Sequence, residues 1–441
     1  MTAGLVRHEG MRHTCLLPVL LSLLVSVAVI PVSGQEVAPS PHAEHQHAGH
    51  EMPSSMLFSV REASGTAWLP DTTPMYGIHR QLGSWQVMGH GNLFLQFLHE
   101  SGDRGDDQGG SINWVMGMAR RELGGGRLGL RGMLSLEPWT ISGCGYPDLL
   151  ATGELCDGDS IHDRQHPHDL FMELAVEYER HLAGSLRWHA YAGLAGEPAL
   201  GPVAYPHRLS AMPNPLAPIA HHWLDATHIT YGAVTAGVSG RRWKVEASAF
   251  NGREPDEHRT DFDFGALDSF SGRLWFVPTP SWALQVSAGR LREAEVAHAG
   301  DARTDVDRVT ASATYHRSAT NSLWATTVAW GRNSEQGVSS NALLAETSAT
   351  WRERDTVFGR FEVGGKSAHD LDVAETDELF TVAKVQAGYT RYFRAWHGLQ
   401  PGVGGSVSVG VVPQSLEVAY GSRANLGFGL FVTLRPAMHK M

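Results

Sequence analysis

Apolar and polar residues alternate through most of the chain after Trp85, in stretches of about ten residues separated by turn residues. In residues 127–136, leucines occupy one face, whereas Arg127 and Arg131 occupy the other. A period of two indicates β-strands, because successive strand side chains point to opposite sides. The same split recurs in residues 169–179, where Met172 falls on the apolar face expected to meet lipid, and in residues 243–249, 383–390 and 426–434. The pattern predicts an all-β protein.

Connection lengths separate a membrane barrel from a soluble sandwich. Short connections are expected at residues 124–126, 181–184, 239–242, 278–281, 317–321, 352–355 and 394–398. Long ones are expected near residues 99–110, 138–166, 197–225, 251–268, 293–304, 331–337, 365–377 and 413–424. This alternation predicts a transmembrane antiparallel up-and-down β-barrel of about 16 strands (about 14 to 18), with short periplasmic turns and long extracellular loops.

The first residues indicate export. Arg12 and His13 precede an apolar run that ends in small residues at Gly34, which predicts a cleaved signal peptide over residues 1–34. An uncleaved anchor is the alternative. Cys144 and Cys156 are then the only cysteines left, and in an oxidising envelope they are expected to form a disulfide.

Composition assigns the remaining segments and excludes several classes of protein. Residues 35–56 form a His/Met-rich leader, residues 57–84 an irregular plug or periplasmic cap, residues 85–435 the barrel, and residues 436–441 a tail. Beyond the signal, no apolar run is long enough for a membrane helix. The net charge of −11 argues against a nucleic-acid partner.

Charged and polar residues opposite the apolar strand faces are expected to line the lumen. They are Arg127, Arg131, Glu173, Glu177, Arg187, His189, Lys244, Glu246, Lys384 and Gln386. A barrel of about sixteen strands is wide enough to hold water. This lining favours passage of small polar solutes or ions.

Histidines concentrate in two of the long loops. They are His162, His166, His168, His207, His221, His222 and His228. If the loops fold over the mouth, these side chains could converge on a divalent metal, with Asp163, Asp169 and Asp225 as carboxylate partners. The alternative is rigid loop packing around several prolines. Asp163, His166, His168 and Asp169 could also activate water in a rim hydrolase, although the chain has no specific catalytic motif and an enzyme is not expected.

The region from Trp85 to Leu434 resembles bacterial outer-membrane porin-like barrels in its alternating strands, one-sided long loops and apolar closing strand. The resemblance implies outer-membrane lipid and the insertion machinery as partners, and a C-terminus in the periplasm. The chain departs from that class at its C-terminal end. In that class an aromatic residue commonly ends the chain, whereas here further residues follow Phe431.

The leader is similar to the His/Met-rich leaders of copper-resistance outer-membrane proteins. Its metal-ligand residues are His42, His45, His47, His50, Met52 and Met56. Imidazoles and thioethers suit Cu or Zn ions, whereas a polar linker is the other interpretation. No cofactor is required. The expected function is an outer-membrane channel for small solutes or ions, linked to copper or zinc handling; the alternatives are a non-transporting metal-binding barrel and a rim hydrolase or protease.

Overall fold

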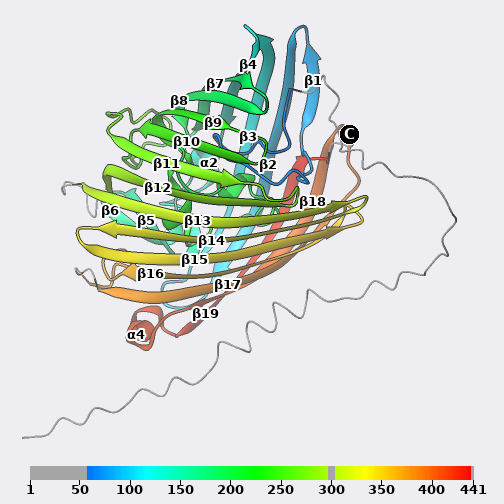
Figure 1. Cartoon of the computed structure of the whole chain (residues 1–441). Coiled ribbons are helices and arrows are strands. Elements are labelled where there is room, and N and C mark those ends of the chain that lie inside the picture. Colours follow the sequence, from blue (N-terminus) through cyan, green and yellow to red (C-terminus); the bar gives the residue numbers. More distant parts are fainter. Residues whose placement is uncertain (1–56, 296–302, 375, 377, 439–441) are drawn as a thin grey trace, which may run out of the picture. The chain divides into compact units, whose positions relative to one another are not determined.

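The computed structural model describes residues 57–295, 303–374, 376 and 378–438 (Figure 1). The predicted signal peptide, the His/Met-rich leader and the last three residues therefore lie outside the described residues. Within the described residues, no α-helix has the length and apolarity needed to cross a membrane.

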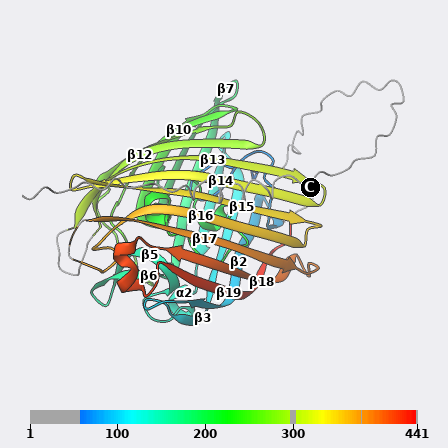
Figure 2. The same ribbon diagram turned by 90° about the horizontal axis from the view of Figure 1, so that it is seen from below.

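The strands form one antiparallel sheet that closes on itself (Figures 1 and 2). This sheet has 17 strands. Strand β1 pairs only with the first residues of β2, so the other 16 strands build the wall. Closure is made where β2 pairs with β19 over Leu93 to Glu100. The predicted all-β barrel of about 16 strands is confirmed.

The strand bounds are β1 Ile78–Leu82, β2 Trp85–Glu100, β3 Asp107–Leu123, β4 Gly126–Leu134, β5 Tyr146–Cys156, β6 Asp159–Gln165, β7 Phe171–Ala183, β8 Leu186–Gly196, β9 Thr230–Ser239, β10 Trp243–Phe250, β11 Ser269–Phe276, β12 Trp282–Glu295, β13 Thr304–Ala319, β14 Ser322–Glu335, β15 Val338–Trp351, β16 Asp355–Ser367, β17 Leu379–Tyr392, β18 Leu399–Val411 and β19 Ala424–Pro436. Short helical turns are α2 Glu137–Thr140, η1 Tyr205–His207, α3 His221–Leu224, η2 Ala226–His228, η3 Gln414–Leu416 and α4 Glu417–Tyr420.

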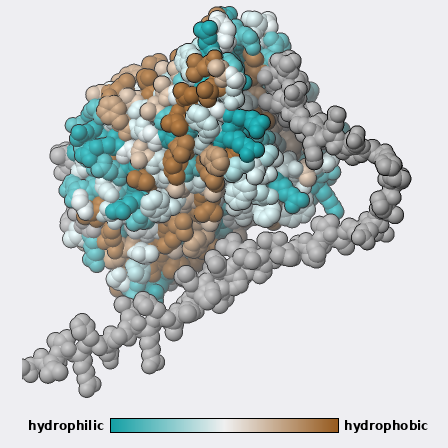
Figure 3. All heavy atoms as spheres, in the orientation of Figure 1, coloured by the Kyte–Doolittle hydropathy of each residue, from teal (hydrophilic) through white to brown (hydrophobic). Residues whose placement is uncertain are grey.

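The wall is apolar outside and polar inside. Along β19, Leu426, Leu430 and Val432 are exposed, whereas Asn425 and Thr433 are buried in the interior. Figure 3 shows apolar side chains in a band across the barrel wall, with hydrophilic side chains towards both ends. Apolar exposure of this extent is unusual for a soluble protein and matches the lipid-facing belt of a membrane barrel.

Two local expectations are wrong. The connection expected over residues 331–337 is only the turn Gln336–Gly337, because β14 and β15 stay paired out to Glu335 and Val338. Backbone pairing needs no apolar side chains, so the hairpin extends past the end of the apolar pattern. Met172, expected on the lipid face, is buried because an extra residue interrupts the β4–β7 register there.

The barrel interior is filled by three segments that are not wall strands. Residues 57–77, here called the N-terminal segment, pack inside the wall and continue into β1. Residues 197–229, here called the inner loop, are almost entirely buried. Strands β5 and β6 form a separate hairpin within the long loop between β4 and β7. The whole connection, residues 135–170, is here called the hairpin loop, and it holds the disulfide Cys144–Cys156.

Candidate functional site: the lumen and its histidine cluster

The inner wall of β4, β7 and β10 holds the N-terminal segment in place. Arg131 pairs with Glu173 at 3.1 Å and donates hydrogen bonds to the backbone oxygens of Gly65 (2.7 Å) and Ala63 (2.8 Å). On β10, Lys244 donates to the backbone oxygen of Thr66. Charged wall groups therefore satisfy backbone oxygens of an irregular segment, which could not be buried without such partners.

The remaining residues of the predicted lining also lie on the inner side, with one partial exception. Arg127 and Glu177 join an ion-pair network around Glu62 of the N-terminal segment. His189 lies 3.2 Å from Glu246, and Arg187, whose side chain is 51% exposed, reaches Glu179 at the short-turn end of β8. Their role as a pore lining stays a prediction.

On β17, the inner wall meets the two long loops. Lys384 pairs with Glu100 of β2 and with Asp148 of the hairpin loop, each at 2.7 Å. Gln386 accepts a hydrogen bond of 2.6 Å from Asn214 of the inner loop. These two positions therefore anchor loops across the lumen.

The inner loop crosses the lumen from wall to wall. Arg208 at its centre pairs with Glu346 of β15 (2.7 Å) and with Asp225 near the end of the loop (2.6 Å). Elsewhere the loop bonds to Asn92 of β2 and Ser287 of β12, among other wall groups. Sequence reasoning assigned Glu346 no role, although its inward phase on the alternating strand β15 indicates it.

Five of the seven predicted loop histidines converge in one buried cluster, here called the histidine cluster. It consists of His166, His168, His221, His222 and His228, and neighbouring ring centroids lie 5.1 to 6.3 Å apart. The hairpin loop supplies two of these residues and the inner loop the other three. His162 lies elsewhere, against Asp163 and Arg104, and His207 lies beside His90 and Trp114.

Carboxylates surround the histidine cluster. His168 pairs with the fully buried Glu137 (3.0 Å), His221 with Asp225 (2.9 Å), and His222 with Glu254 (3.0 Å). His166 lies 3.2 Å from Glu154. Asp169 lies near Arg259, at 3.8 Å.

Electrostatics set the protonation of this cluster. Burial lowers the pKa of His166 and His228 well below the usual histidine value. Burial also lowers the pKa of His221, although its hydrogen bond to Asp225 acts in the opposite direction. Burial acts to raise the pKa of Asp225, but Arg208 and His221 hold it below the usual range.

His222 faces a cavity of about 420 Å³ at the long-loop end of the barrel. Glu154, Glu254 and Glu295 also line this cavity, here called the acidic cavity. Ligand atoms of His222, Glu254 and Glu295 all lie within 4.8 Å of one another, and the Nε2 atom of His222 has no hydrogen-bond partner. This set could hold a divalent metal ion. Sequence reasoning missed both glutamates, because each ends or follows a strand without a motif around it.

The residues of the hydrolase alternative have separate partners. Asp163 accepts hydrogen bonds from the backbone N–H of Leu150 (2.8 Å) and from Arg104 (3.1 Å). His166 and His168 face glutamates instead.

No protein-family model and no curated protein matches the chain. Among solved structures, the chain is similar to Salmonella typhi OmpF in complex with daunomycin, with 9% identity, coverage of 81% of this chain and 100% of that chain, and a TM-score of 0.47. Vibrio cholerae OmpT gives 10% identity, coverage of 81% and 99%, and a TM-score of 0.45. The outer membrane channel DcaP of Acinetobacter baumannii gives 8% identity, coverage of 82% and 100%, and a TM-score of 0.44. The fold assignment rests on the strand pairing of the chain itself.

Proposed function

We propose that the chain is an outer-membrane, porin-like channel for small polar solutes or ions, held closed by the inner loop and the N-terminal segment. The observation that carries this proposal is the inverted polarity of the wall, with an apolar belt outside and ion-paired side chains inside. A wall of 16 strands encloses more space than its own side chains fill, so removable segments occupy the rest.

The occluding segments contact the wall through apolar clusters and through polar groups, and the polar contacts are numerous. Lys366, Arg360 and Ser348 each donate a hydrogen bond to a backbone oxygen of the inner loop. Such bonds exchange readily for bonds to water, at a net cost of about 1 kcal/mol each, whereas a fused apolar core would not. The polar part of this contact therefore opposes hydration of the lumen only weakly.

We further propose that the channel handles transition-metal cations and that His222, Glu254 and Glu295 bind them at the long-loop end. An imidazole with two carboxylates suits Zn(II), Cu(II) and similar divalent ions. The acidic cavity would also raise the local concentration of any cation. Capture of metal without transport is the second candidate, because the same residues support it without requiring a pore.

Single-channel conductance of the refolded protein in a planar bilayer tests the channel. We expect rare openings from the intact chain and steady current from a variant lacking residues 57–76, because the deletion removes the segment held by Arg131 and Lys244. Asp256→Asn in an exposed loop is the control. Folded barrels that carry no current with or without the segment would refute the channel and leave metal capture.

Cu(II) or Zn(II) added to either side of the bilayer tests metal handling separately. Current that these ions alter in the intact channel, but not in His222→Ala, would support the proposal. Unaltered stoichiometric metal binding after His166, His168, His221 and His222 are all replaced by alanine would exclude the histidine cluster as a metal site.

A further inference from the structure

The methionines of the barrel gather in one place. Between residues 57 and 437 the chain has seven, at Met75, Met88, Met116, Met118, Met133, Met172 and Met212. Four of them line a single interior cavity of about 100 Å³, and the other three pack in the apolar cluster around it. They come from β2, β3, β4, β7, the N-terminal segment and the inner loop. Residues far apart in the sequence thus place their thioether groups in one region of the barrel interior.

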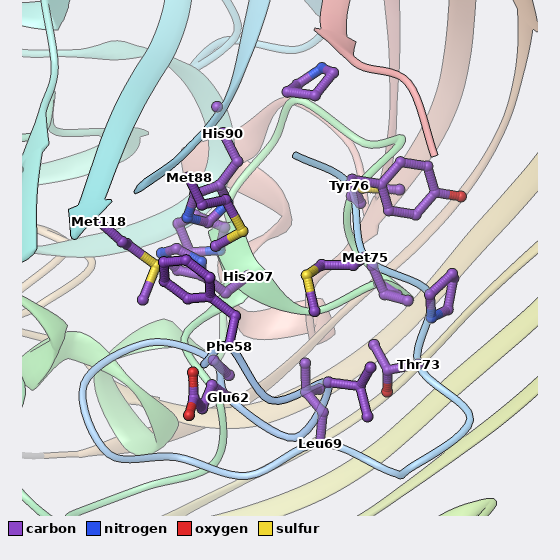
Figure 4. A pocket seen from close by; sticks show the side chains of 18 of the residues that line it. Phe58, Glu62, Leu69, Thr73, Met75, Tyr76, Met88, His90, Met118 and His207 are labelled. Atoms are coloured by element: carbon purple, nitrogen blue, oxygen red, sulfur yellow. The ribbon is translucent and has the colours of Figure 1, made fainter. Parts of the chain in front are cut away.

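Two imidazoles lie among these thioethers. His90 of β2 places its Nε2 atom 3.1 Å from the Sδ atom of Met116. Its ring centroid is 5.6 Å from that of His207 on the inner loop, and the Trp114 ring lies 4.8 Å from His207. Figure 4 shows Met88, His90, Met118 and His207 together on one side of the cavity, with Met75 across from them.

Neither imidazole has a carboxylate partner. Among the described residues, no ion pair joins His90 or His207 to an acidic side chain. The one acidic residue that lines the cavity, Glu62, pairs with Arg120 and Arg127 instead. The two imidazoles therefore have sulfur and aromatic neighbours, and Arg131, which also lines the cavity, pairs with Glu173.

Methionine is a common gap filler in apolar cores, so packing alone must be weighed. Other interior clusters of this barrel are filled by Leu, Val and Ala, such as the one around Leu371 and Val382, and the one around Leu224 and Leu344. Gap filling explains flexible side chains but not two half-buried histidines that have no anionic partner. A ligand that prefers thioether and neutral imidazole explains both features.

We propose that Met88, His90, Met116, Met118 and His207, here called the methionine chamber, bind a soft monovalent cation, Cu(I) or Ag(I). Thioether sulfur and neutral imidazole are the ligand types that Cu(I) selects, whereas Zn(II) and other harder ions prefer carboxylates. Burial lowers the pKa of His207 well below the usual histidine value, which leaves the ring unprotonated and able to coordinate.

Two residues that line the cavity at the chamber also face the short-turn end of the barrel. A larger cavity of about 750 Å³ lies there, lined by the turns at Arg352 and His397. Tyr76 and Arg435 line both cavities. The Arg435 guanidinium stacks on Tyr76, with 4.6 Å to the ring centroid, and lies 3.6 Å from the Sδ atom of Met212. Tyr76 and Arg435 therefore form part of the boundary between the two cavities.

Equilibrium binding of Ag(I), and of Cu(I) under anaerobic conditions, tests the chamber in the folded full-length protein in detergent. The parent carries alanine at the six leader ligands, His42, His45, His47, His50, Met52 and Met56, so that they do not compete. We expect one tightly bound ion per chain, with sulfur neighbours in its X-ray absorption spectrum. Met88→Leu with Met118→Leu should weaken binding at least about tenfold, since even groups that only support metal ligands have effects of that size.

Met133→Leu with Met172→Leu is the matched control, because these residues pack in the same cluster but do not line the cavity. Leucine preserves the volume of methionine, so both double variants should fold. A difference in gel migration between unheated and heated protein verifies that each variant is folded. Equal affinity in both pairs, or an absorption spectrum with only nitrogen and oxygen neighbours, would overturn the proposal. Conductance plays no part in this measurement, so a silent barrel that binds Ag(I) would refute the channel alone.

Discussion

Both the histidine cluster and the methionine chamber hold imidazoles between the inner loop and the wall, but their neighbours differ in kind. In the cluster, His168, His221 and His222 each pair with a carboxylate. In the chamber, His90 and His207 face thioethers and an indole ring. One side-chain type thus belongs to an ionic network at one place and lies among thioethers and aromatic rings at the other. The neighbours, not the histidines, determine which ion each place can select.

The two regions also differ in what holds the inner loop. At the cluster the loop is held by buried charges centred on Arg208, which has ion pairs of 2.6 and 2.7 Å to two carboxylates. At the chamber it is held by apolar and aromatic contacts. Loss of one partner from a buried charge pair is expensive, whereas a volume-conserving change in an apolar cluster is not. Substitutions should therefore separate the two regions by size of effect.

The largest effect is expected from Arg208→Ala. It removes Arg208 from the buried Asp225 and leaves Glu346 with Arg360 alone, which should cost about 3 to 5 kcal/mol and detach the inner loop. The urea midpoint of the refolded barrel should fall and single-channel current should rise. Arg290→Ala, which removes an exposed ion pair with Asp307, should leave both unchanged. An unchanged midpoint for Arg208→Ala would show that the loop is held mainly elsewhere.

Much of the wall was predictable from the sequence, because lipid outside and polar groups inside impose a period of two. Leu430 and Thr433 of β19 lie on the sides that their phase indicates. The alternation fails where pairing is irregular, as at Met172, because an inserted residue changes the side that a residue faces without any apolar signature. It also misjudges Gln336–Gly337, where a polar hairpin tip resembles a loop.

The lumen was less predictable, because its contacts join segments far apart in the chain. Richness in histidine indicated that two loops might meet, and five histidines do meet, yet His207 lies with His90 of β2, 117 positions away in sequence. The methionines have no common spacing at all. Only the closure of the barrel, together with the path of the inner loop, brings them together.

The next effect concerns metal selectivity. His222→Ala should weaken Zn(II) binding about 10- to 100-fold while Ag(I) affinity stays unchanged, because the acidic cavity and the chamber use different ligands. Met88→Leu with Met118→Leu should do the reverse. Isothermal titration of each variant with each ion measures both affinities. If one substitution weakens both ions alike, the two regions are a single site and the comparison fails.

A smaller effect is expected from pH. His228 is held neutral, with a pKa well below the usual value of about 6.5, because it is buried; unfolding releases it to bind a proton. Its contribution to stability is therefore present above pH 6.5 and is lost as the pH falls below that value. His228→Asn should reduce the difference in unfolding free energy between pH 7.5 and 5.5 by about 1.4 kcal/mol.

The comparison with His228→Asn is needed because other groups oppose this trend. Burial raises the pKa of Glu154 to about 8 against the effect of Arg259, so Glu154 favours the folded state as the pH falls. Asp225 remains ionised throughout the range, because Arg208 and His221 outweigh the effect of burial on its pKa. The wild-type curve sums these responses, whereas the difference between wild type and variant isolates His228. Parallel curves for the two proteins would mean that His228 is not held neutral.

The smallest effect is expected in the apolar cluster around the chamber, where methionines only pack. Met133→Leu with Met172→Leu exchanges thioethers for branched alkyl groups of similar volume, so each change should cost less than about 1.5 kcal/mol. Thermal unfolding of the detergent-folded protein without metal should differ little from wild type, and Met88→Leu with Met118→Leu should behave alike. Added Ag(I) should then raise the unfolding temperature of wild type and of the Met133 and Met172 pair but not of the Met88 and Met118 pair, since only a ligand that binds the folded state stabilises it. Equal stabilisation of both pairs would show that the ion binds elsewhere and that the methionines only pack the interior.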